Sequence, residues 1–138
     1  MKLLKFSFLA LLFVGFLSCN DDDDVVVATC EVTDWVGTYT GGTETCTSGE
    51  TGPTTITVTA SGTGIKIEST TEYTAGGGSE TSLDELTVTG CTAIDSEVES
   101  GVSWTFTATL DGKNISIKEI QEINGVVTID CVYTGTRP

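Results

Sequence analysis

The sequence predicts an all-β protein, an antiparallel up-and-down meander of roughly seven or eight strands that closes into a β-barrel. Three observations predict this class. Threonine alternates with apolar residues over most of the chain, and a period of two is typical of half-buried strands. Turn signals such as Asp-Gly and Asn-Gly separate these stretches. Proline occurs only twice in 138 residues. The alternative architecture is an open two-sheet β-sandwich.

The first residues have the features of an export signal. A basic N-terminus precedes the apolar run 6–17, whose length suits a signal peptide. Residues 15–19, Gly-Phe-Leu-Ser-Cys, resemble the lipobox at which bacterial lipoproteins are cleaved and lipidated. We therefore expect residues 1–18 to be a lipoprotein signal peptide and Cys19 to carry the acyl chains of a membrane anchor. The alternative is an ordinary signal peptide, with Cys19 incidental.

An acidic segment follows the cysteine directly. Asp21 to Asp24 are repelled by anionic headgroups, so residues 19–29 are expected to form a spacer between the membrane and a single domain, residues 30–138. The Cys-Asn-Asp-Asp-Asp-Asp pattern also resembles the acidic export signal of Bacteroidota lipoproteins. That resemblance implies the outer face of the outer membrane, at the cell surface. A lipoprotein that faces the periplasm is the alternative.

The net charge limits the partners. The chain carries 6 Lys and Arg against 20 Asp and Glu, and removing the leader with its two lysines gives 4 − 20 = −16. Nucleic acid is excluded as a partner, because its binding depends on cationic side chains that neutralise phosphates. A large negative charge also favours solubility and a monomer.

Four cysteines remain in the domain: Cys30, Cys46, Cys91 and Cys131. An even number in an exported domain predicts two disulfides. Metal binding is disfavoured, because the chain has no histidine and no CxxC pair. Three pairings are possible. If residues 35–46 form one strand, Cys30 and Cys46 lie at its opposite ends, which argues against joining them. Two pairings remain, and of these Cys46–Cys131 with Cys30–Cys91 is the one expected.

The apolar alternation of the first half predicts strands over residues 35–46, 54–60, 64–69, 71–74, 83–92 and 91–98. The first of these places Trp35, Gly37 and Tyr39 on one face. The glycine-rich residues 75–79 predict a flexible hairpin tip, because they lack the lysine and helix of a phosphate-binding loop. No helix is expected.

The second half alternates most clearly over residues 101–110. One face of that strand comprises Val102, Trp104, Phe106, Ala108 and Leu110. Asp111-Gly112 and Asn124-Gly125 predict hairpin turns. The strand that begins near Asn114 changes its apolar phase toward Ile120, which predicts a bulge or bend there. The last strand, residues 126–136, is expected to share one inward face among Val127, Ile129, Cys131 and Tyr133.

Three segments resemble small lipocalin-like lipoproteins of Bacteroidota. They are residues 34–40 (Asp-Trp-Val-Gly-Thr-Tyr-Thr), 90–92 (Gly-Cys-Thr) and 131–136 (Cys-Val-Tyr-Thr-Gly-Thr). The likeness covers most of the domain. It implies a lipocalin-like barrel whose interior can be apolar, and it brings no catalytic residue with it.

The chain offers little for catalysis. Without histidine, only lysines or carboxylates are left as bases, and Lys66, Lys113 and Lys118 fall at solvent-facing positions. The serines lie in Thr- and Gly-rich stretches that lack a nucleophile motif. We therefore expect a protein that is not an enzyme, with no catalytic residue and no cofactor.

One acidic group is a candidate calcium site. Asp95, Glu97 and Glu99 share a face of an expected strand, and Asp84 and Glu85 precede them. Oxygen-rich groups of this kind can hold Ca²⁺. No segment has the ligand spacing of an EF-hand, so a solvated surface without a metal site is expected.

The large aromatic residues form the candidate ligand site: Trp35, Tyr39, Trp104, Phe106 and Tyr133. Barrel core is the competing interpretation, since an eight-stranded barrel can either fill with side chains or hold one small ligand. A neutral, apolar ligand is expected. A fatty-acid carboxylate would need a buried arginine, and Arg137 near the C-terminus is the only one in the chain.

Two functional hypotheses follow. In the first, a surface-exposed, lipid-anchored barrel binds a small apolar ligand or a glycan. In the second, the barrel is filled, and the protein is a non-enzymatic envelope or interaction module, adhesin-like or structural. That module would bind an envelope protein or polysaccharide through its acidic, Thr-rich outer surface.

Overall fold

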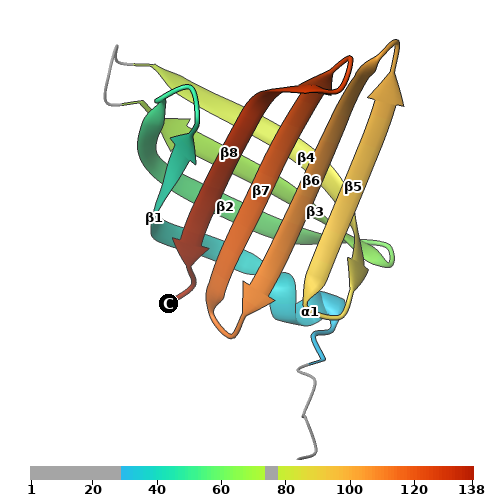
Figure 1. Ribbon diagram of the computed structural model, residues 1–138. Coiled ribbons are helices and arrows are strands. Elements are labelled where there is room, and N and C mark those ends of the chain that lie inside the picture. The colour runs from blue at the N-terminus through green and yellow to red at the C-terminus, as the bar shows by residue number, and fades with distance from the viewer. Residues whose placement is uncertain (1–28, 74–77) are drawn as a thin grey trace, which may run out of the picture.

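The computed structural model describes residues 29–73 and 78–138. The signal peptide, Cys19, nearly all of the acidic spacer and most of the glycine-rich tip lie outside the described residues. A short helix precedes eight antiparallel strands: α1 (Val32–Trp35), β1 (Gly37–Cys46), β2 (Thr51–Ser61), β3 (Gly64–Glu72), β4 (Ser79–Thr89), β5 (Thr92–Glu99), β6 (Val102–Asp111), β7 (Asn114–Ile123) and β8 (Val126–Thr136). The strands form a closed barrel in sequence order, which confirms the expected up-and-down β-barrel (Figure 1).

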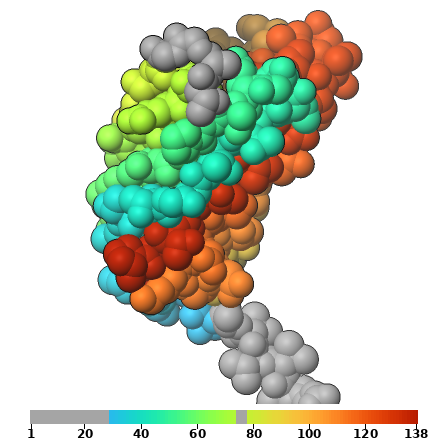
Figure 2. Space-filling view, turned by 90° about the vertical axis from the view of Figure 1, so that its left-hand side faces the viewer, coloured from blue at the N-terminus to red at the C-terminus, as the bar shows by residue number. Residues whose placement is uncertain are grey.

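Tight turns produce the meander. Asn124 and Gly125 both have positive φ angles, 52° and 78°, as the type I′ hairpin turn requires, and Ser100-Gly101 is similar. Asp111 pairs with Asn114 across the two-residue turn at Gly112. These short connections force each strand to pair with the next one. Figure 2 shows the closing seam, where β1 lies beside β8.

Some strand boundaries differ from the sequence expectation. Residues 71–74 are not a separate strand, because β3 continues through Glu72. The stretch 83–92 is also not one strand: β4 ends at Thr89, and β5 begins at Thr92 after a turn at Gly90, which has a φ of 60°. These changes bring the number of strands to eight.

Trp35 belongs to α1, so the expectation that it begins the first strand was wrong. The Asp34 carboxylate accepts a 2.8 Å hydrogen bond from the Glu31 backbone N–H, which closes a capping box around one helical turn. The helix places Trp35 in the core with no exposed surface, where its indole N–H donates to the Gly90 carbonyl at 3.3 Å. Figure 1 shows α1 across one end of the barrel, here called the closed end.

A bulge in β1 reverses the side-chain alternation of that strand. Tyr39 pairs with Ile56 and Gly42 with Thr54, so β1 carries one extra residue. Gly41, within the bulge, has a φ of 71°, a conformation that favours glycine. Because of the extra residue, Tyr39 and Glu44 both point into the barrel although five positions separate them.

A second bulge lies next to Ile120, as expected, but its extra residue belongs to the partner strand β8 and not to β7. Gln121 pairs with Ile129 and Glu122 with Val127, which leaves Thr128 as the extra residue. Val127 was expected inside with Ile129, but the bulge moves it to the outer face, where it is 52 % exposed.

The apolar core fills the half of the barrel nearest α1. It includes Trp35, Tyr39, Ile56, Val58, Ile65, Ile67, Leu86, Leu110, Ile115 and Ile117. Arg137 seals this end by donating to the carbonyl oxygens of Asp34 (2.8 Å) and Val36 (2.9 Å), and it lies over the Tyr39 ring. Among the described residues, no helix is long and apolar enough to cross a membrane.

Two disulfides confirm the expected pairing. Cys30–Cys91 joins the segment before α1 to the β4–β5 turn at the closed end. Cys46–Cys131 joins the first and last strands, where the two residues face each other directly. Each bridge therefore fastens a part of the chain that no hairpin turn holds in place.

Candidate functional site

The lining of the barrel changes from apolar to polar halfway along its axis. On β7, the inward positions Ile115 and Ile117 are buried, and Glu119 follows them toward the opposite end. On β4, Leu86 is buried, and Asp84 takes the next inward position in the same direction. We call this second half the hollow. It lies at the open end of the barrel, away from α1.

The hollow also opens sideways between β4 and β5. These strands form only three residue pairs, Thr87 with Ile94, Val88 with Ala93 and Thr89 with Thr92. Beyond them, β4 pairs only with β3, and β5 only with β6. Figure 1 shows β4 and β5 diverging from their common turn. The barrel wall is thus interrupted along most of this seam.

A wide cleft of about 490 Å³ occupies the gap. The side chains that line it include Asp84, Asp95, Glu97, Trp104 and Phe106. Phe106 pairs directly with Asp95, and Trp104 with Glu97, so each aromatic residue stands beside a carboxylate of the neighbouring strand. The cleft therefore combines flat apolar surface with negative charge.

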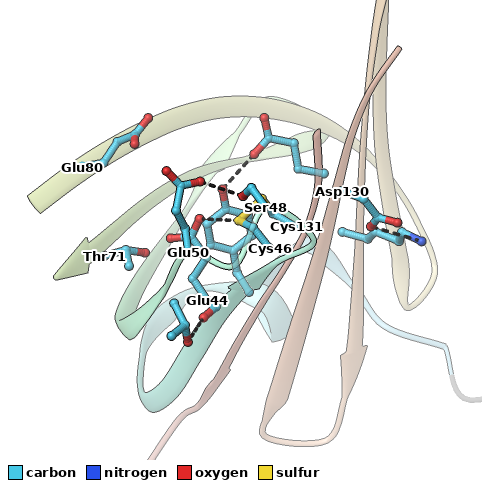
Figure 3. Close-up of a disulfide and its surroundings, with 12 residues drawn as sticks. Glu44, Cys46, Ser48, Glu50, Thr71, Glu80, Asp130 and Cys131 are labelled. Atoms are coloured by element: carbon cyan, nitrogen blue, oxygen red, sulfur yellow. Dashed lines mark hydrogen bonds and ion pairs between the residues drawn. A yellow bond between two sulfur atoms is a disulfide. The ribbon is translucent and has the colours of Figure 1, made fainter. Parts of the chain in front are cut away.

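A smaller cavity of about 60 Å³ lies deeper in the hollow. Its walls carry the carboxylates of Glu44, Glu80 and Glu119, the phenols of Tyr73 and Tyr133, and the hydroxyls of two serines and a threonine. Glu119 lines both this cavity and the cleft, so the two lie next to each other. Figure 3 shows Glu44 with Glu80 on another strand of the same end of the barrel.

Two phenols hold two of these carboxylates. The Tyr73 hydroxyl donates to Glu80 at 3.0 Å, and the Tyr133 hydroxyl donates to Glu119 at 2.8 Å. These bonds fix the carboxylates in place and occupy one oxygen of each.

Glu44 is held much less well. It is only 3 % exposed, and its Oε2 atom has no hydrogen-bond partner among the described residues. Its Oε1 lies 3.5 Å from the Tyr73 hydroxyl, which donates to Glu80 instead, and 3.1 Å from the Cys46 sulfur. A buried carboxylate without donors is costly, because it loses its hydration without replacement.

Burial and negative charge raise the pKa values of acidic groups in the hollow. Burial raises the pKa of Asp84 to about 6, and the charges of Glu119 and Asp95 add to that effect. Burial also raises the pKa of Glu119, although the hydrogen bond from Tyr133 opposes the shift. Burial likewise raises the pKa of the Tyr133 phenol. The shifts of Asp84 and Glu119 have the direction expected for buried carboxyl groups that lack a neighbouring cation.

The four basic residues of the described chain lie outside the hollow. On the outer face, Lys66 approaches Glu85 at 3.9 Å and Lys118 approaches Asp130 at 3.5 Å. Lys113 belongs to the β6–β7 turn, and Arg137 seals the closed end. None of these side chains lines the cavities that Glu119 shares.

The structure divides the five aromatic candidates between the two ends. Trp35 and Tyr39 are fully buried in the core, where Tyr39 donates to the Trp35 carbonyl at 2.7 Å. Trp104 and Phe106 line the cleft, and Tyr133 lines the deep cavity. Only these last three can contact a ligand in the hollow.

Sequence reasoning missed Glu44, Tyr73, Glu80 and Glu119. No local signal marks Glu44, because the β1 bulge alone turns it inward. The acids on β5 were noticed and expected to be solvated. Asp95, Glu97 and Glu99 are indeed exposed, yet they also line the cleft.

One group has the composition of a metal site, but its chemistry does not fit. Glu44, Cys46 and Cys131 offer ligand atoms within 4.8 Å of one another. The two sulfurs are bonded to each other, so neither is a thiolate that could bind a metal.

No protein-family model, no curated protein and no solved structure matches this chain. The class of the protein is therefore defined by its own geometry. It is an eight-stranded antiparallel up-and-down β-barrel, stapled by two disulfides, with one end filled and the other hollow.

Proposed function

We propose that this protein is a surface-exposed, lipid-anchored binding protein that takes a small molecule into the hollow of its barrel. The observation that carries the proposal is the half-filled interior. A barrel of this size could be filled with side chains throughout, yet the hollow keeps a cleft of about 490 Å³ open to the side. Trp104 and Phe106 supply ligand contact there, as aromatic residues do in many small-molecule sites.

The second hypothesis, an interaction module with a filled barrel, finds partial support in exposed apolar side chains. Val98, Ile123 and Val126 are 76 %, 40 % and 64 % exposed near the β5–β6 and β7–β8 turns of the open end. They could contact an envelope protein. The half-filled interior favours small-molecule binding over this alternative.

Trp104 provides the test of ligand binding. Only one of the two tryptophans can contact a ligand in the cleft, because Trp35 is fully buried in the core and Trp104 lines the cleft. Titration with the neutral apolar dye N-phenyl-1-naphthylamine should change the tryptophan emission and raise the melting temperature. The Trp104→Phe variant should lose the emission change. Absence of any emission or melting response, to the dye and to a panel of small amphiphiles, would refute binding in the hollow.

The anchor is tested separately. The proposed site of lipidation is Cys19, which follows the apolar leader and precedes the four aspartates. Cys19→Ala should abolish labelling with a radioactive or clickable fatty acid and release the protein into the soluble fraction. Replacing Asp21 to Asp24 by serine should reduce digestion by protease added to intact cells. Unchanged labelling, or unchanged digestion, would contradict the corresponding part of the proposal.

A further inference from the structure

We propose that the hollow binds an organic ammonium ion, a ligand that carries a protonated amine on an apolar or aromatic body. This inference rests on the proposed function and adds the chemical class of the ligand. The amine would lie in the deep cavity against Glu44. The body would extend into the cleft against Phe106 and Trp104.

The charge of the hollow selects a cation. Eight carboxylates from four strands line its adjoining cavities: Glu44, Glu80, Asp84, Glu85, Asp95, Glu97, Glu99 and Glu119. Within the described chain, no lysine or arginine lines these cavities. An anionic ligand would be repelled, and a neutral one would leave the acids uncompensated.

Glu44 supplies an unpaired acceptor at the bottom of the hollow. Its Oε2 atom is buried and has no partner within the described part of the chain, although the residue lines the deep cavity. A protonated amine has three N–H donors, and one of them can satisfy this oxygen in a charge-assisted hydrogen bond. The hydroxyls of Ser69 and Thr71 line the same cavity and offer further acceptors.

The aromatic residues stand where the body of such a ligand would lie. Phe106 pairs with Asp95 on one side and with Glu119 on the other. Neighbouring strands are about 4.8 Å apart, so this row places one aromatic ring between two carboxylates. The face of an aromatic ring attracts a cation and can also pack against the apolar part of a ligand. This combination fits an organic cation better than a bare ion.

A hard divalent cation fits the deep cavity less well. Calcium takes 6 to 8 oxygen ligands. In the deep cavity, Tyr73 and Tyr133 already donate to Glu80 and Glu119 and so occupy part of their acceptor capacity.

The test compares matched probes on the full-length protein in detergent micelles at pH 7. Phenethylamine is positively charged, 2-phenylethanol is its neutral counterpart, and 3-phenylpropionate is an anion. Calorimetric titration should show phenethylamine binding about tenfold or more tightly than the alcohol, and no binding of the anion. Glu44→Gln should weaken amine binding about tenfold or more and leave binding of the alcohol unchanged. Glu68→Gln, on the exposed outer face of β3, is the matched control and should change neither.

The outcomes separate the two proposals. If the neutral dye and the alcohol bind but the amine gains nothing over them, small-molecule binding stands and the ammonium inference is overturned. The ammonium inference is also overturned if the Glu44→Gln variant binds phenethylamine as tightly as the wild type does. It is likewise overturned if the wild type binds calcium but no amine, and Glu44→Gln abolishes the calcium binding. If no compound binds, both proposals fail. Glu119→Gln carries the same test should Glu44→Gln fail to fold.

Discussion

Single residues in the hollow bear charge in places where charge is costly. The Oε2 atom of Glu44 is buried without a donor among the described residues, and Asp84 and Glu119 have pKa values raised by burial and by neighbouring acids. The Tyr133 hydroxyl offsets part of this cost for Glu119. Residues arranged for stability alone would not concentrate like charge around a cavity, so this pattern is expected of a binding site.

The stability difference between Asp84→Asn and the wild type should depend on pH. The folded-state pKa of Asp84, about 6, lies above its ordinary value of 3.8. Between these values the folded state binds more protons, so the wild type loses stability as pH rises through this window. The amide does not titrate. The free energy of unfolding of the variant should therefore exceed that of the wild type by about 1 kcal/mol at pH 7, after allowance for solvent screening. At pH 4 the difference should be small.

Urea denaturation at pH 4 and pH 7 measures this difference. Glu68→Gln, an exposed acid on the outer face, serves as the control and should show no comparable change between the two pH values. If Asp84→Asn changes the free energy of unfolding equally at both pH values, the raised pKa of Asp84 is contradicted.

At the scale of elements, bulges decide which side chains reach the hollow. The extra residue in β1 turns Glu44 and Cys46 inward, and the extra residue in β8 sends Val127 outward. β1 also approaches β8 closely after its bulge. A Cβ atom at Gly42 would collide with the carbonyl oxygen of Thr134, so glycine is needed at this contact.

Gly42→Ala should therefore destabilise the barrel by about 2 kcal/mol or more, because the new methyl group must displace backbone atoms. The matched control is Gly78→Ala, whose added Cβ meets no atom within 4 Å. The control should stay within about 0.5 kcal/mol of the wild type. Equal denaturation midpoints for the two variants would show that the seam between β1 and β8 is not as tight as described.

At the scale of the whole molecule, the barrel has one rigid end and one accommodating end. The closed end combines the apolar core with α1, the Arg137 contacts and the Cys30–Cys91 bridge. The open end keeps the cavities and the interrupted β4–β5 seam. The contacts of the closed end can therefore stabilise the fold, while the open end holds a site that is not optimised for stability.

Removing the Cys30–Cys91 bridge by double alanine substitution should destabilise the protein by about 4 kcal/mol on the loop-entropy account, because the bridge spans 61 residues. It should also loosen α1, since the bridge ties the preceding segment to the β4–β5 turn. In a Trp104→Phe background, Trp35 emission should shift to the red. An unchanged spectrum and an unchanged denaturation midpoint would show that α1 is held without the bridge.

The architecture of this protein can be predicted from local features of the amino-acid sequence. Period-two alternation, best seen over residues 101–110, specifies strands, and two-residue turns such as Asn124-Gly125 allow only antiparallel neighbours. The even cysteine count predicted two disulfides, and the placement of Cys30 and Cys46 at opposite ends of one strand argued against a bridge between them. These features depend on local geometry, which a sequence records directly.

The lining of the interior depends on how distant strands come together in the folded barrel. The bulges in β1 and β8 change the inward face without a clear sequence signal, so the position of Glu44 could not be predicted. Taken singly in the sequence, acids such as Glu80, Asp95 and Glu119 fit solvent-facing positions of a strand. They become a site because closure of the barrel brings distant strands around one space, and the effect of a buried charge depends on every neighbour in that space.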